Sequence, residues 1–225
     1  MEHPILFLDL ILEHFGIHIP PHVTYSWVVM LVLLGLGMMA TRRIALVPAG
    51  GQNVFEMIIG GLEDFMVEIT GEEGRAFYPY IATVFLYIMF CNLIGLLPGF
   101  FSPTANINTT LSLALCTFVY THYLGIKFHG VKYIKHFLGP IPALAPLFFP
   151  IEIIGHFARV LSLTLRLFGN IMGEDLVLLI LIFLAGMFLA PLPMMFLAIF
   201  TSVVQAFVFT LLSMMYFAGS MEHAH

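Results

Sequence analysis

The chain has 225 residues, of which 60% are hydrophobic and only 9% are charged. Because a soluble domain usually carries about 25% charged residues, this composition excludes an ordinary soluble protein and indicates an integral membrane protein. The eight basic residues form no basic patch, which argues against a nucleic-acid partner, and the two cysteines in apolar stretches predict no metal or disulfide framework.

The N-terminal part predicts an arm, one membrane span and one surface helix. Residues 1–22 mix apolar with acidic residues and histidines and lack the basic start of a secretory signal peptide, so we expect an interfacial arm on the outer face. Residues 24–40 are apolar, with aromatic residues near one end and two arginines after the other, which predicts the first span. In residues 51–71, acidic and apolar residues alternate at helical spacing, which is typical of an amphipathic helix that contacts other helices.

The rest of the chain predicts four more apolar helices separated by loops. Residues 139–150 contain four prolines, so we expect no regular helix there, and the prolines at 191 and 193 are expected to separate the last two helices. The expected membrane helices after the first are residues 77–97, 109–126, 151–190 and 193–218.

The basic residues of the connections fall on one side of the membrane in this arrangement. If the N-terminus is outside, the inner segments hold Arg42, Arg43, Arg75, Lys127, Lys132 and Lys135, and the outer segments hold no lysine or arginine. This asymmetry predicts an outer N-terminus and a cytoplasmic C-terminus. The expected fold is one all-α integral membrane domain, residues 1–225, with about five transmembrane helices and one amphipathic surface helix.

The segment 151–190 is too long to cross a bilayer upright. As one helix it would measure about 60 Å, twice the hydrocarbon core of about 30 Å. We therefore expect this penultimate helix to tilt steeply, at more than about 60° from the membrane normal, or to bend or break, with Gly169 and Gly173 as bending points.

Polar residues form a stripe along this helix. Intervals of three, four or seven residues place them within about 90° of one another on the helix surface. The stripe consists of Glu152, His156, Arg159, Arg166, Asn170 and Glu174. A polar stripe on an intramembrane helix must face protein or water. Alternatively, Glu152 pairs with His156 or Arg159 in salt bridges that lock a helical bundle.

Arg166 needs a different explanation, because a charge at the bilayer centre costs about 2.5–3.5 kcal/mol. No carboxylate lies within one turn of it, and the other four expected spans contain no aspartate or glutamate. Its counter-charge must then come from a partner protein, an anionic ligand or water.

Three stretches carry a resemblance to a known family. RLFGN at 166–170, within SLTLRLFGNIMGEDL, resembles the signature of subunit a of F-type ATP synthases. NLIGLLPGFFSPTANIN at 92–108 and QAFVFTLLSMMY at 205–216 are similar to two further regions of the bacterial family, in the same order.

The resemblance implies a non-catalytic stator subunit of the proton channel, without cofactor, in the bacterial plasma (inner) membrane. Its partners would be the ring of c subunits, the b-subunit peripheral stalk, the lipid bilayer and the translocated ion, H⁺ or Na⁺. Arg166 would face the ring carboxylate between two aqueous half-channels. Asn92, Asp175 and Gln205 would line the outer path, Glu152 would lie near the inner exit, and Asn170 lies one turn beyond Arg166.

Two differences from the family pattern leave the residues of the proton path unassigned. Many relatives carry an acidic residue after RLFGN and a histidine on the last helix, where this chain has Ala198. Direct alignment favours Asp175 as the acidic residue, whereas the helical stripe favours Glu174. The alternative functions are a secondary transporter that binds an anionic substrate at Arg166 and an intramembrane enzyme. No internal repeat supports the former and no HExxH or GxSxG motif the latter.

Overall fold

The structure is a computed structural model that describes residues 16, 18–41, 51–97, 99–130, 133, 145–185 and 191–221. This part of the chain is helical and contains no strand. Its elements are the α-helices α2 (Pro21–Thr41), α3 (Gly51–Thr70), α4 (Tyr78–Ile94), α5 (Ile107–His129), α7 (Ala145–Ala185) and α8 (Pro191–Met221), and the 3-10 helices η1 (Glu72–Phe77) and η2 (Pro103–Ala105). The arm predicted at 1–22 and the basic residues at 42, 43, 132 and 135 lie almost entirely outside the described residues.

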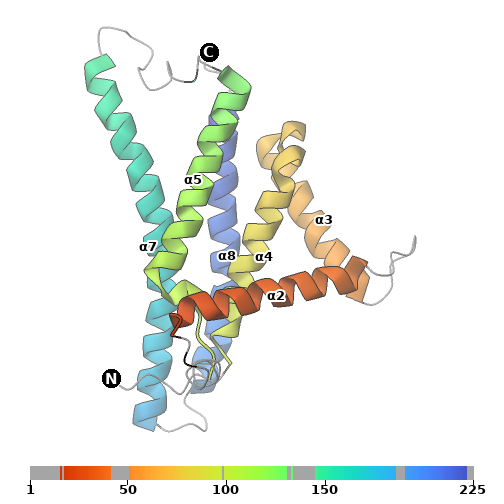
Figure 1. Ribbon diagram of the computed structural model, residues 1–225, viewed down its shortest axis with the longest axis vertical. Coiled ribbons are helices and arrows are strands. Elements are labelled where there is room, and N and C mark those ends of the chain that lie inside the picture. Colours follow the sequence, from red (N-terminus) through yellow and green to blue (C-terminus); the bar gives the residue numbers. More distant parts are fainter. Residues whose placement is uncertain are drawn as a thin grey trace.

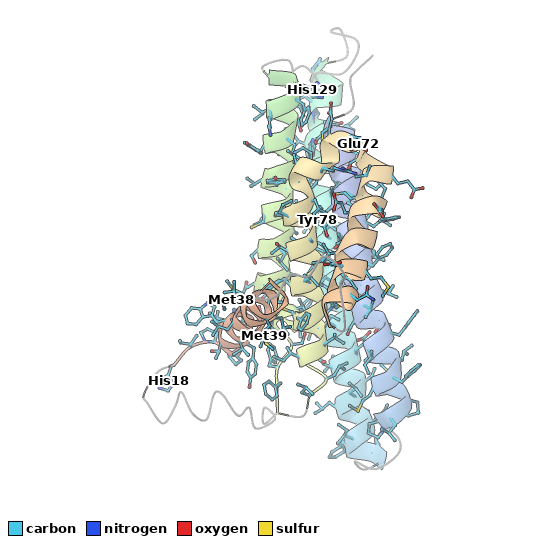
Figure 2. All side chains as sticks on the ribbon, turned by 90° about the vertical axis from the view of Figure 1, so that its right-hand side faces the viewer. His18, Met38, Met39, Glu72, Tyr78 and His129 are labelled. Atoms are coloured by element: carbon cyan, nitrogen blue, oxygen red, sulfur yellow. The ribbon has the colours of Figure 1, made fainter. Side chains whose placement is uncertain are left out.

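The helices α4, α5, α7 and α8 form a bundle, and α2 lies crosswise to it (Figure 1). The view in Figure 2, turned by 90°, looks along α2 while the bundle stays upright. The Tyr25 hydroxyl of α2 donates a hydrogen bond to the carbonyl of Gly99 at 3.2 Å. This contact ties the first helix to the loop that follows α4.

The helix α3 is amphipathic, as its sequence predicts. Leu62 and Met66 are buried, whereas Glu56, Asp64 and Glu68 are exposed. The helix packs on η1 and α8, so its apolar side faces protein.

The loop between α4 and α5 folds tightly against the end of α4. A Cβ at Gly95 would lie 2.5 Å from the Cβ of Ser102, so this close approach requires glycine. The helix α5 then begins at Ile107. It is capped by Asn106, whose side chain accepts a hydrogen bond from the backbone N–H of Asn108 at 2.9 Å.

The helix α7 is longer at its start than the sequence predicts. It begins at Ala145 and contains Pro150, so the expectation that residues 139–150 form no regular helix is wrong for 145–150. The reason is positional: the first N–H groups of a helix have no partner within it, so Pro146 costs no bond there, and Pro150 removes only one. The helix continues unbroken past Gly169 and Gly173 to Ala185.

The last helix also begins earlier than predicted. Pro191 and Pro193 belong to the first turn of α8 and do not separate it from α7. The missing N–H of proline is harmless in a first turn, and its fixed φ suits a helix start.

Four helical segments within the described residues are long and apolar enough to cross a membrane: Pro21–Met39, Glu72–Ile94, Phe149–Leu184 and Pro191–Met221. The helix α5, which contains the third predicted span, has 23 residues but is richer in threonine and less apolar. The hydroxyls of the buried Thr110, Thr117 and Thr121 donate to carbonyls of their own helix, as Thr121 does to Thr117 at 2.8 Å. The protein is thus an all-α multi-pass membrane protein, and the fifth span stays a prediction.

Candidate functional site

Arg166 lies near the middle of α7 and is partly exposed. Its guanidinium donates a hydrogen bond to the hydroxyl of Ser162, one turn earlier, at 3.1 Å. Among the described residues, no carboxylate oxygen lies within 4.0 Å of an Arg166 nitrogen, whereas Arg75 has two such partners. The described part of the chain therefore provides no acidic partner for the central cation.

The polar residues that follow Arg166 contact α8. The Asn170 amide donates to the side-chain carbonyl of Gln205 at 2.8 Å. Gln205 is buried, and its own amide nitrogen has no hydrogen-bond partner among the described residues. One turn further, the hydroxyl of Thr201 donates to the carboxylate of Glu174.

Glu174 and Asp175 have different surroundings although they are neighbours in sequence. Glu174 reaches α8 at Thr201, whose hydroxyl also lies 3.2 Å from the carbonyl of Ala198. The Glu174 carboxylate is therefore next to the turn of α8 that carries Ala198. Asp175 is partly buried, and no hydrogen bond or ion pair joins it to another described residue.

Asn92 is buried between α4, η2 and α8, and both ends of its amide are engaged. The nitrogen donates to the backbone carbonyl of Ser202 at 3.2 Å, and the oxygen accepts from the Thr104 hydroxyl at 2.6 Å. Because Ser202 lies three residues before Gln205, Asn92 meets the same stretch of α8 as the Asn170 contact, but from the side of α4.

A second polar group lies on the N-terminal side of Arg166. Nε2 of His156 lies 3.6 Å from the Glu152 carboxylate, so the structure contains one of the two ion pairs that the sequence allows. The other, between Glu152 and Arg159, is not formed. The Arg159 guanidinium instead lies 5.5 Å from the ring centre of Tyr216 on α8.

One side of α7 packs on the bundle, and the side that carries Ser162 and Gly169 is open. The packed stripe consists of His156, Val160, Leu163, Leu167 and Ile171. On the open side, a Cβ added at Gly155, Gly169 or Gly173 would meet no atom within 4 Å. The backbone of α7 near Arg166 is thus accessible to a neighbouring helix.

Comparisons with known proteins give the family. A family model described as "ATP synthase A chain" matches residues 23–218. The chain belongs to the ATP synthase A chain family. Proteins called "ATP synthase subunit a" from Syntrophobacter fumaroxidans, Desulfosudis oleivorans and Citrifermentans bemidjiense are 63%, 59% and 53% identical to it. Each of these alignments covers 100% of both chains.

As a member of the ATP synthase A chain family, the protein is a subunit of the membrane sector and serves ATP synthesis and proton transport. It works in a complex with other subunits of that sector. The resemblance inferred from RLFGN and the two further stretches is therefore confirmed.

The structure brings some of the predicted site residues together and separates others. Asn170, Glu174 and Gln205 lie on the contact between α7 and α8, whereas Glu152 lies 14 residues before Arg166, about 21 Å away along α7. Two polar residues near His156 were assigned no role from the sequence, His122 of α5 and Tyr133. Neither is close to His156 in sequence, so only packing brings them near.

Proposed function

We propose that this chain is the stator part of the ATP synthase proton channel and that Arg166 is the fixed cation met by a carboxylate of the rotating c ring. The observation that supports it is the absence of any described carboxylate within 4.0 Å of Arg166, on a helix with an open side next to it. The carboxylate that compensates this charge then comes from another chain.

An arginine suits this position because it cannot lose its proton and so cannot relay one. Protons that arrive from one side of the membrane therefore cannot pass Arg166 directly to the other side. A ring carboxylate that approaches the guanidinium is favoured in its ionised form, so it releases its proton there. Proton flow then requires the ring to turn.

We propose that the two half-channels approach Arg166 from its two sides along α7. Asn170, Glu174 and Gln205 line the outer half-channel, with Asp175 as the second acidic residue at its wall. Glu152 lies at the inner one. Asn92 holds α8 in place beside the outer path. The translocated ion in this proposal is H⁺. The alternative is Na⁺, and the ion-binding site of the c subunit determines which of the two is carried.

The open side of α7 supports a closely packed neighbour. Glycines at 155, 169 and 173 have free space beside them, and Ser162 is exposed. Small residues let two helix backbones approach closely in a membrane. We place the c ring on this side. The exposed acidic face of α3 contacts the peripheral stalk in this proposal. The N-terminus lies outside, and the C-terminus lies in the bacterial cytoplasm.

The test is Arg166→Ala in the complete ATP synthase, reconstituted into vesicles. We expect ATP-driven proton pumping to be lost, while the soluble head still hydrolyses ATP. Arg75→Ala is the matched control, because Arg75 is an exposed arginine paired with Glu63 and Glu72 on the surface, and it should pump normally. Normal pumping by Arg166→Ala would contradict the proposal. If the wild-type protein binds an anionic substrate and Arg166→Ala does not, the alternative function, a secondary transporter, would be favoured.

A further inference from the structure

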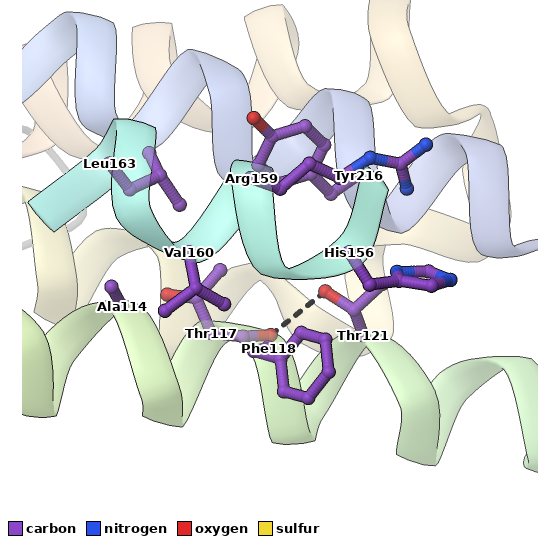
Figure 3. Close-up of a pocket in the computed structure, with 9 residues that line it drawn as sticks. All are labelled: Ala114, Thr117, Phe118, Thr121, His156, Arg159, Val160, Leu163 and Tyr216. Atoms are coloured by element: carbon purple, nitrogen blue, oxygen red, sulfur yellow. Dashed lines mark hydrogen bonds between the residues drawn. The ribbon is translucent and has the colours of Figure 1, made fainter. Parts of the chain in front are cut away.

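A small cavity lies between α5, α7 and α8, two turns before Arg166. Its volume is about 10 Å³, on the scale of a single water molecule. Figure 3 shows the residues around it, with Thr117 and Thr121 on α5, His156 and Arg159 on α7, and Tyr216 on α8. These side chains bring hydroxyl, imidazole and guanidinium groups to a wall that is otherwise apolar and is built by Ala114, Phe118, Val160 and Leu163.

His156, which lines the cavity, meets a second histidine, His122 of α5. The ring centres of His122 and His156 are 4.8 Å apart, at an interplanar angle of 68°. Nδ1 of His122 lies 2.8 Å from the Tyr133 hydroxyl, and Nε2 of His156 lies 3.6 Å from the Glu152 carboxylate. Four groups that can carry a proton are thus adjacent to one another.

The cluster connects the surface of the chain with its interior. The Glu152 side chain is 35% exposed and that of His156 only 10%. On α7 the cavity extends from His156 to Leu163, which lies three residues before Arg166. Over the ten residues from His156 to Arg166, α7 advances about 15 Å.

The side chains around the histidines include an acid and a guanidinium. Histidine gains and loses a proton near neutral pH, so it is the usual side chain for a proton shuttle. The Glu152 carboxylate lies on one side of His156, and the Arg159 guanidinium lies over the Tyr216 ring at the cavity edge.

We propose that His156 and His122, together with Glu152, Tyr133 and the water-sized cavity, form the proton-exchange site at the inner end of the path to Arg166. A proton from the inner aqueous phase binds to a ring nitrogen of His156, and the other ring nitrogen releases one to the cavity. His122 and Tyr133 hold and exchange a second proton beside it. No covalent bond other than N–H and O–H forms or breaks. This inference rests on the proposed function, because it assigns the inner half of the same path.

The experiment compares His156→Gln and His122→Asn in the complete ATP synthase in vesicles. Glutamine can keep the contact of Nε2 with Glu152, and asparagine can keep that of Nδ1 with Tyr133, but neither side chain titrates. Passive proton conduction is measured after removal of the soluble head, and ATP-driven pumping before it. His129→Gln is the control, because His129 lies two turns beyond His122 on α5 and does not line the cavity.

We expect passive conduction to fall about tenfold or more in His156→Gln, the low end of the effect of one lost proton-transfer group. His122→Asn should lose less, and His129→Gln should match the wild type. Added imidazole should restore conduction in His156→Ala, where it can occupy the vacated space. Imidazole should not restore Arg166→Ala.

Wild-type conduction in both assembled histidine variants would overturn the inference. A loss that imidazole does not restore would also overturn it, in favour of a packing role. If a His156 variant fails to assemble, the conduction of His122→Asn tests the inference: reduced conduction supports it, and wild-type conduction contradicts it. Arg166→Ala separates the two proposals: if it stops pumping while the histidine variants conduct normally, only the inner exchange site is wrong.

Discussion

At the scale of single residues, neighbouring positions on α7 differ in what they contact. Glu174 reaches across to Thr201 on α8, beside Ala198, whereas Asp175 makes no hydrogen bond or ion pair with a described residue. Glu174 thus places a carboxyl group next to the turn of α8 that carries Ala198. In the proposed path, this carboxyl group takes the place of an ionisable side chain at 198.

Glu174→Gln should therefore reduce proton conduction by about tenfold or more, because the amide keeps a hydrogen bond to Thr201 but cannot carry a proton. Thr201→Val keeps the carboxyl group and should lose much less. Passive conduction in head-stripped vesicles measures both effects.

Asp175→Asn is the companion variant for this measurement. Its conduction should lie between those of Thr201→Val and Glu174→Gln if Asp175 forms only the wall of the path. Wild-type conduction in both Glu174→Gln and Asp175→Asn would remove this region from the path.

At the scale of elements, the packing of α4 against α8 depends on a buried amide. Asn92 joins three elements, through the backbone of Ser202 on α8 and the hydroxyl of Thr104 in η2. The Ser102 hydroxyl adds a bond to the carbonyl of Cys91 at 3.0 Å. A buried polar group that loses its partner costs more than an exposed one.

Asn92→Ala should lower the free energy of unfolding by about 2 kcal/mol, because it leaves the Thr104 hydroxyl and the Ser202 carbonyl without their partner. Thermal unfolding of the detergent-solubilised protein measures this change. Thr83→Ala is the control, because the exposed Thr83 hydroxyl bonds only to the carbonyl of Pro79 in its own helix. Equal melting temperatures for both variants would show that Asn92 does not support the packing.

At the scale of the whole molecule, helix length and direction are linked. At 1.5 Å per residue, α2 measures about 31 Å and matches a hydrocarbon core of about 30 Å, whereas α7 measures about 61 Å and α8 about 46 Å. Since α2 lies crosswise to the bundle (Figure 1), these helices cannot all run along the membrane normal. If α2 is upright, the whole bundle of α4, α5, α7 and α8 tilts steeply. A steep tilt of α7 is what the length of the segment 151–190 predicts.

Sequence reasoning located the helices well because long apolar blocks indicate helices that can cross a membrane. It failed at Pro150 and at Pro191, since composition does not reveal that a proline falls in the first turns of a helix. The contact of Glu174 with α8 could be predicted from helical periodicity on α7, because Glu174 belongs to the polar stripe. The contact between His156 and His122 could not be predicted, because no spacing within one helix encodes how α5 packs on α7.

The most direct test of the central claim is disulfide cross-linking in the complete ATP synthase. Gly169→Cys, on the open side of α7, is combined with a cysteine one turn from the carboxylate of the c subunit. The natural Cys116, exposed on α5, serves as an internal control, with Cys91 replaced by serine. We expect a cross-link between position 169 and one c subunit that blocks ATP-driven pumping until it is reduced, and none from Cys116. The absence of any cross-link at 169, with Arg166 compensated by a carboxylate of its own chain, would contradict the account.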